Sequence, residues 1–167
     1  MKAKIKWILL GIVTVIVVVV IYFVSLTRVA NQHASMLEGY ALSIEGLPEV
    51  DRVLDVHQFN GLESYIVSRV RLHDGQEIYY FVRDEVVQHY LPQSDLIREE
   101  QARQIAYDTI ASALGEASGS QEIEFFLIQV GVLEDVIIFE LQARVDEDVH
   151  YVIMDGQTGE VILHFNA

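Results

Sequence analysis

The strongest pattern along the chain is an unbroken apolar run over residues 7–26, which holds no charged side chain. A helix of about 20 residues crosses the roughly 30 Å hydrocarbon core of a bilayer. Lys2, Lys4 and Lys6 precede the run, and positive residues favour the cytoplasmic side. The pattern therefore predicts a cytoplasmic tail over residues 1–6, one transmembrane helix over 7–26, and residues 28–167 outside the cell membrane.

A cleaved signal peptide is the alternative interpretation of this run. Such a peptide has an apolar region of about 7–15 residues followed by a small-residue cleavage site. The run is longer than that, and the residues after it offer no A-x-A pattern. We therefore favour a retained single-pass anchor.

The pattern over residues 28–91 predicts a helix followed by a three-stranded antiparallel meander. Apolar residues recur at nearly helical spacing over 28–44, and Gly46 and Pro48 then end the helix. Alternating runs predict strands over 52–59, 62–72 and 77–83, joined by turns at Asn60-Gly61 and Asp74-Gly75. Packing on this sheet is the favoured role of the helix's apolar stripe, and a docking face for a partner helix is the alternative.

A second unit of the same kind is predicted over residues 95–167, after a short linker that begins at Pro92. Helical spacing covers 98–114, and four β signals follow over 122–130, 136–145, 149–155 and 160–165. In the second of these strands the odd positions from Ile137 to Val145 share one face. The predicted fold class is therefore α+β, with an N-terminal transmembrane helix and two small tandem modules, each a helix packed on an antiparallel sheet. A single merged core with one continuous sheet is the rival.

Charge divides sharply at the anchor. All 25 acidic residues follow it, together with eight arginines and no lysine, so the outer part carries a net charge of −17. Such a surface disfavours nucleic acid and anionic lipid headgroups as electrostatic partners. Apolar residues make up 51% of the chain, which indicates a folded ectodomain. The chain has no cysteine, which excludes disulfides and thiol chemistry.

No motif of a catalytic or metal site stands out. No two of the six histidines have the i, i+4 spacing of a helical zinc pair, and neither a nucleophile elbow nor a phosphate-binding glycine loop occurs. The acidic stretch 146–148 and the segment 155–160 are interpreted as hairpin turns. We predict that the protein is not an enzyme, with no catalytic, cofactor-binding or metal-binding residues, no cofactor and no small-molecule substrate. The histidines, interpreted as ordinary surface or partly buried residues, are His33, His57, His73, His89, His150 and His164.

Several segments resemble a known family. Residues 50–53, 59–67 and 74–82 resemble the TseB-like (YpmB-like) cell-wall elongation regulators of Gram-positive bacteria. Residues 97–102 and 151–161 resemble a PepSY-type module. The resemblance implies PepSY/cystatin-like modules behind a membrane anchor. Two departures from the family pattern are Phe81, where tryptophan is expected, and a weak N-cap on the second predicted helix.

The resemblance implies a function as a membrane-anchored, extracytoplasmic regulator of peptidoglycan elongation that binds a penicillin-binding transpeptidase. The alternative is a PepSY-type inhibitor or chaperone-like module for an exported peptidase, and an undetected hydrolase is a more distant third. The sequence leaves the partner-binding residues unknown. Tyr79 and Phe81 are candidates if their face is exposed, although packing under the first helix is favoured for them.

Overall fold

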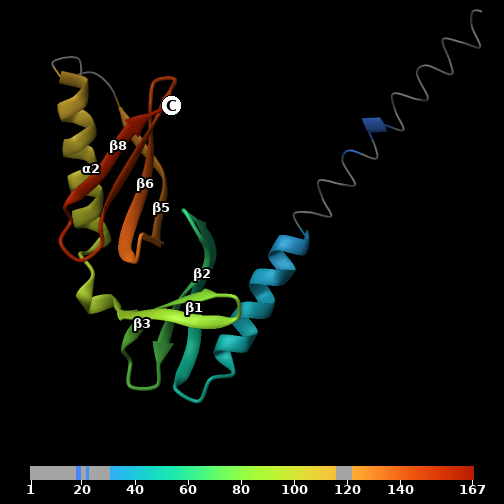
Figure 1. Cartoon of the computed structure of the whole chain (residues 1–167). Coiled ribbons are helices and arrows are strands. Elements are labelled where there is room, and N and C mark those ends of the chain that lie inside the picture. Colours follow the sequence, from blue (N-terminus) through green and yellow to red (C-terminus); the bar gives the residue numbers. More distant parts are fainter. Residues whose placement is uncertain (1–17, 20–21, 23–30, 116–121) are drawn as a thin grey trace, which may run out of the picture. The chain divides into compact units, whose positions relative to one another are not determined.

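The computed structural model describes residues 18, 19, 22, 31–115 and 122–167 (Figure 1). The predicted cytoplasmic tail, and the predicted transmembrane helix apart from Val18, Val19 and Tyr22, lie outside the described residues. Among the residues that are described, no helix is both long and apolar enough to cross a membrane. The chain divides into two compact units, Met1–Tyr40 and Ala41–Ala167. The second unit contains both β-sheets.

Residues 31–45 are helical, and the helix ends in a turn at Gly46 as predicted. The backbone N–H of Gly46 donates to the carbonyl of Leu42 at 3.1 Å, which closes the last turn. The least exposed positions of this helix include Leu37, Ala41 and Ile44, which follow the predicted apolar stripe, and Ile44 is buried.

The first sheet has four antiparallel strands, β1 (Val50–Asn60), β2 (Ser64–Leu72), β3 (Glu77–Arg83) and β4 (Val86–Pro92), in the order β1-β2-β3-β4. The prediction of a three-stranded meander is therefore wrong, because it missed β4. The β3–β4 turn consists of Asp84 and Glu85, with φ of 50° and 62°. A tight turn of this kind normally contains Asn or Gly, which adopt positive φ at low cost. Without them, the sequence pattern carries no turn signal.

The two predicted turns of the first sheet are confirmed. Asn60 is the last residue of β1, and Gly61 begins a three-residue connection, so β2 begins at Ser64 instead of residue 62. Asp74-Gly75 lies between β2 and β3, and Gly75 has a φ of 89°. The backbone N–H of Gln76 donates to the Asp74 carboxylate at 2.9 Å, which stabilises the turn.

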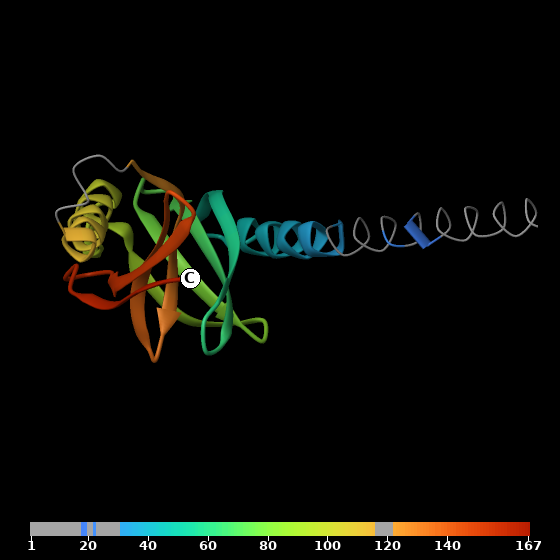
Figure 2. The same ribbon diagram turned by 90° about the horizontal axis from the view of Figure 1, so that it is seen from above.

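The second module matches its prediction closely. Helix α2 (Glu99–Leu114) precedes β5 (Ile123–Leu133), β6 (Val136–Val145), β7 (Asp148–Asp155) and β8 (Val161–Asn166), which form a separate sheet in the order β5-β6-β7-β8. The helix lies beside this sheet when the molecule is viewed from above (Figure 2). In β6, the predicted inward face is confirmed from Phe139 onward, because Phe139, Leu141, Ala143 and Val145 are buried. At the start of the strand the prediction fails, because Ile137 is only half-buried and Ile138, on the opposite face, is fully buried.

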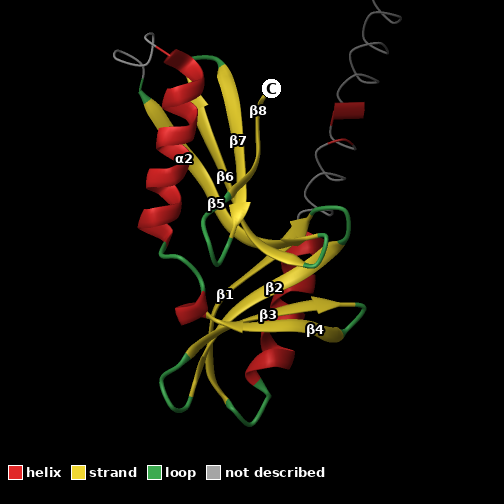
Figure 3. Ribbon diagram, turned by 60° about the vertical axis from the view of Figure 1, so that its left-hand side comes forward, coloured by secondary structure: helices red, strands yellow, loops and turns green. Residues whose placement is uncertain are grey.

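The two sheets share one hydrophobic core, although they are not one continuous sheet (Figure 3). Phe59 on β1 is 2% exposed and lies at the junction. A Cβ atom added at Gly131 on β5 would lie 2.3 Å from the Phe59 ring, so the two strands approach closely only because residue 131 is glycine. The core combines Tyr65, Val67, Tyr79 and Phe81 of the first sheet with Leu141, Val152 and Met154 of the second, and with Ala102, Ala106 and Ile110 of α2.

Candidate functional site

Tyr79 and Phe81, the contact residues considered from the sequence, are buried at 8% and 0% exposure. Both belong to the core that the first sheet shares with the second sheet and α2. From the sequence, the first helix was expected to cover Tyr79 and Phe81, whereas in the structure the second sheet and α2 cover them. The reason is that the sequence pattern shows which face of β3 is apolar but does not show which distant element covers it. Neither side chain is available as an exposed contact.

A cleft lies between the inner face of the first sheet, the start of α2 and the edge of β5. It consists of two adjoining cavities of about 710 Å³ and about 330 Å³, which share the lining residues Arg69, Tyr79, Glu99 and Phe139. Arg69 on β2 stands between Asp55 on β1 and Tyr79 on β3 in the strand register. Burial raises the pKa of Tyr79, and the charge of Arg69 opposes that shift. Strand pairing therefore places a half-buried arginine in the middle of the cleft.

Several charged groups around this cleft already have partners within the chain. Arg71 and Glu77 form an ion pair at 2.5 Å, and Arg103 and Glu99 form another at 2.9 Å. Arg98 at the start of α2 donates through its Nε to the side-chain oxygen of Gln101 at 3.3 Å. Because these groups already have partners, a ligand would have to compete with internal contacts for them.

His57 connects the two sheets within the smaller cavity. Its Nε2 lies 2.9 Å from the carbonyl oxygen of Val130 on β5, and its Nδ1 lies 3.0 Å from the Asp55 carboxylate. Both neighbours are acceptors, and a neutral imidazole has only one N–H, so the protonated ring alone satisfies both contacts. Burial acts to lower the pKa of His57, but the hydrogen bonds to Asp55 and Val130 outweigh it and raise the pKa. The hydrogen bond from His57 is also the main reason that the pKa of Asp55 is lowered, against the effect of burial.

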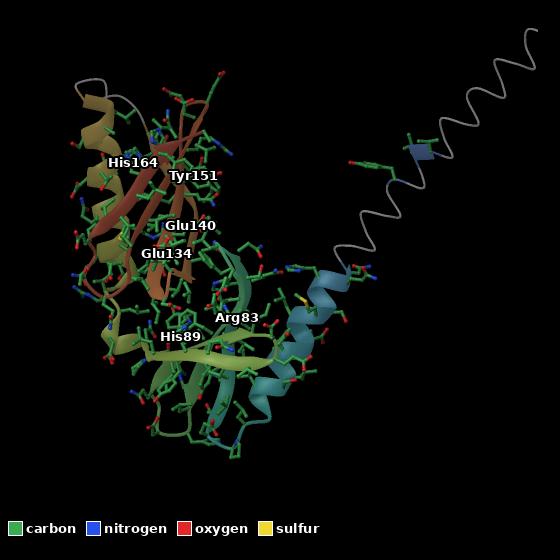
Figure 4. All side chains as sticks on the ribbon, viewed as in Figure 1. Arg83, His89, Glu134, Glu140, Tyr151 and His164 are labelled. Carbon is green, nitrogen blue, oxygen red and sulfur yellow. The ribbon has the colours of Figure 1, made fainter. Side chains whose placement is uncertain are left out.

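A third cavity, of about 420 Å³, is lined by β1–β2 loop residues, β2, β3 and the β5–β6 turn. Arg83, which is labelled in Figure 4, pairs with Glu63. Its guanidinium lies 5.6 Å from the centre of the Tyr65 ring. His89 on β4 approaches Asp135 of the β5–β6 turn at 4.0 Å. Like the His57 contact, this pair connects the two sheets through a histidine.

The sequence pattern does not distinguish His57 from the other five histidines, so its role was not predicted. The only local signal is that Asp55 and His57 are two residues apart on a predicted strand, so their side chains share a face. The partner Val130 is 73 residues further along the chain and has no polar side chain to mark it. Within the described parts of the chain, no three His, Asp or Glu side chains are grouped so that they could hold a metal ion.

The fold defines a class of α+β protein in which two four-stranded antiparallel sheets and a helix share one core. No family model matches the sequence, and no curated protein matches it. A solved structure of the YpmB protein from Bacillus subtilis has a similar fold, with a TM-score of 0.61 and 17% sequence identity. The similarity covers 78% of this chain and 96% of that chain. At this level of identity, the comparison supports a YpmB-like fold.

Proposed function

We propose that the protein is a membrane-anchored regulator of cell-wall elongation, which acts outside the cell by binding a penicillin-binding transpeptidase. The observation that carries the proposal is the fold. The sequence segments resemble the TseB-like (YpmB-like) regulators, and independently the two-sheet body resembles the YpmB structure over 96% of that structure's chain. The sequence resemblance of residues 97–102 and 151–161 to a PepSY-type module supports the finer description of the two modules as PepSY/cystatin-like. Catalysis plays no part in this proposal.

Two physical arguments support binding as the mode of action. A retained anchor would confine residues 28–167 to a thin layer at the membrane, which raises their effective concentration near other anchored proteins. The net charge of −17 on this part of the chain would favour a partner with a basic surface. Screening by salt should then weaken the association.

The test is affinity capture of the tagged full-length chain from detergent-solubilised membranes, at low and at high salt, followed by mass spectrometry. We expect a penicillin-binding transpeptidase that is captured less efficiently at high salt. The control is a chain that keeps the anchor but lacks residues 41–167, because it shows whether a protein is captured only by sharing a micelle. A strain without the protein should show altered cell length and altered sensitivity to wall antibiotics.

Capture of an exported peptidase, together with normal cell shape in the deletion strain, would instead favour the PepSY-type inhibitor or chaperone. The topology is tested separately by adding protease to wall-stripped intact cells. We expect digestion of the ectodomain, and full protection of residues 28–167 would refute the proposed location.

A further inference from the structure

The outer edge of the second sheet is formed by β8. β8 is the last strand in the order β5-β6-β7-β8, and within the described residues it pairs with β7 alone. From Leu163 to Asn166 the pairing is regular, and one extra residue, Ile162, interrupts it near the start of the strand. An edge strand presents N–H and C=O groups that can pair with another chain.

Edge strands usually carry features that block such pairing, and β8 has few of them. Its sequence from Val161 to Asn166 contains no Asp, Glu, Lys, Arg, Pro or Gly. His164 is its one titratable side chain, and burial together with the neighbouring His150 lowers its pKa, which favours the neutral ring. By contrast, β4 ends in Pro92, and its register shift lies in its middle, whereas that of β8 lies near its start. On β5, the His57 ring covers the Val130 carbonyl.

Apolar side chains accompany this open backbone. Leu163 and Phe165 are 45% and 43% exposed, and in the register they face Ile153 and Tyr151 on β7. The rings of Phe165 and Tyr151 are nearly parallel, with centres 4.7 Å apart. Tyr151 and His164 lie in the same upper part of the second sheet in Figure 4. We call Leu163, Phe165, their partners Ile153 and Tyr151, and the half-exposed Ile162 the β8 patch.

Acidic groups lie at both ends of the patch. Glu160 is exposed immediately before β8. At the other end, the backbone of Ala167 exchanges two hydrogen bonds with that of Val149, which brings the end of the strand beside the acidic turn at residues 146–148. A second copy of this chain, and an anionic lipid surface, would both meet repulsion there. The complement of this surface is a strand with an apolar middle and basic ends.

We propose that the β8 edge binds an extended segment of a partner protein, which adds to the second sheet as a further strand, with alternate apolar residues against the β8 patch and Lys or Arg at its ends. Main-chain hydrogen bonds supply much of the affinity in this mode, and side-chain contacts supply the specificity. The inter-sheet cleft is a weaker candidate, because Glu77 and Glu99 in its lining are already paired with Arg71 and Arg103, and Arg98 donates to Gln101. The inference deepens the proposed function by naming the surface, and it rests on that function only for the identity of the partner.

The test uses the full-length chain in detergent micelles and a short fluorescent peptide of alternating valine and threonine with lysines at both ends. Binding is measured by anisotropy, and amide hydrogen exchange locates the peptide. We expect saturable binding that slows exchange in β8. Leu163→Lys should weaken binding about ten-fold, because it removes an apolar contact and repels the basic ends. Tyr90→Lys on edge strand β4, where Tyr90 is 69% exposed, is the matched control and should leave binding unchanged.

The proposal is wrong if the folded chain does not bind the peptide, if Tyr90→Lys weakens binding as much as Leu163→Lys does, or if the protected amides lie outside β8. The proposal is also overturned if the chain self-associates or binds anionic vesicles and Leu163→Lys abolishes that association, because the occupant of the β8 edge would then be a second copy or a lipid surface. If the peptide binds at β8 but no transpeptidase is captured from membranes, the docking surface stands and the proposed function fails. If Leu163→Lys still captures the transpeptidase normally, the function stands and the surface fails.

Discussion

The contact between Phe59 and Gly131 is the sharpest test of the shared core. A Cβ atom at residue 131 would lie 2.3, 2.4 and 2.5 Å from three atoms of the Phe59 ring, whereas carbon atoms in good contact are about 3.5–4.0 Å apart. The ring is 2% exposed, so it has little room to withdraw. Overpacking of this kind costs about 1–3 kcal/mol, against a gain of about 0.5–1 kcal/mol for replacing a strand glycine with alanine. We expect Gly131→Ala to lower the free energy of unfolding by about 1–2 kcal/mol.

The cause of this loss can be isolated with a double-mutant cycle. Phe59→Ala alone should cost about 3–5 kcal/mol, because it leaves a cavity between the sheets. In that background Gly131→Ala should cost nothing or should stabilise the protein, since the clash is gone and the two effects are strongly coupled. Gly39→Ala is the control, because its Cβ would meet nothing within 4 Å. Urea unfolding of the full-length chain, followed by circular dichroism, provides the free energies. Additive effects of the two substitutions would refute the contact, and with it the close approach of β1 and β5.

Three further predictions concern single positions. The pKa of His57 is raised from 6.5, so the stabilisation from His57 is complete below about pH 6.5 and is lost as the pH rises through its folded pKa. The pKa of Asp55 is lowered from 3.8, so the stabilisation from Asp55 is lost as the pH falls through its folded pKa. His57→Gln should therefore destabilise the protein more at about pH 5 than at about pH 8 in urea titrations, and an equal loss would contradict the ionised pair. Leu141→Ala, at a fully buried position, should cost about 2–5 kcal/mol in the same assay and Gln142→Ala much less, so similar losses would show that the facing of β6 is wrong. The buried Ser68 hydroxyl has no hydrogen-bond partner among the described residues, so Ser68→Ala should leave the thermal midpoint unchanged or raise it, and a clear decrease would indicate a partner for that hydroxyl.

Local patterns were sufficient to predict most of the elements. The period of two along β6 correctly predicted the buried side chains from Phe139 to Val145, because successive residues of a strand point to opposite faces, but it did not predict the burial of Ile138. The turn at Asp74-Gly75 was predictable because glycine tolerates the positive φ that Gly75 adopts there. The Asn60-Gly61 signal located the β1–β2 connection, although neither residue has a positive φ. Strand β4 was not predicted because its turn, Asp84-Glu85 at positive φ, lacks the glycine or asparagine that marks such a turn in a sequence. In each of these cases, the outcome depended on neighbours within a few residues.

The relation between the two modules was decided by tertiary structure alone. The sequence predicted two separate sheets but did not show that they share a core, since an apolar face indicates burial without naming its partner. Phe59 meets Gly131, and His57 meets the carbonyl of Val130, across more than 70 residues of chain. Every residue has a backbone carbonyl, and glycine has no side chain, so neither Val130 nor Gly131 carries a sequence feature that indicates its partner. Contacts of this kind form only when the folded sheets bring the two strands together, so no periodicity in the chain could have predicted them.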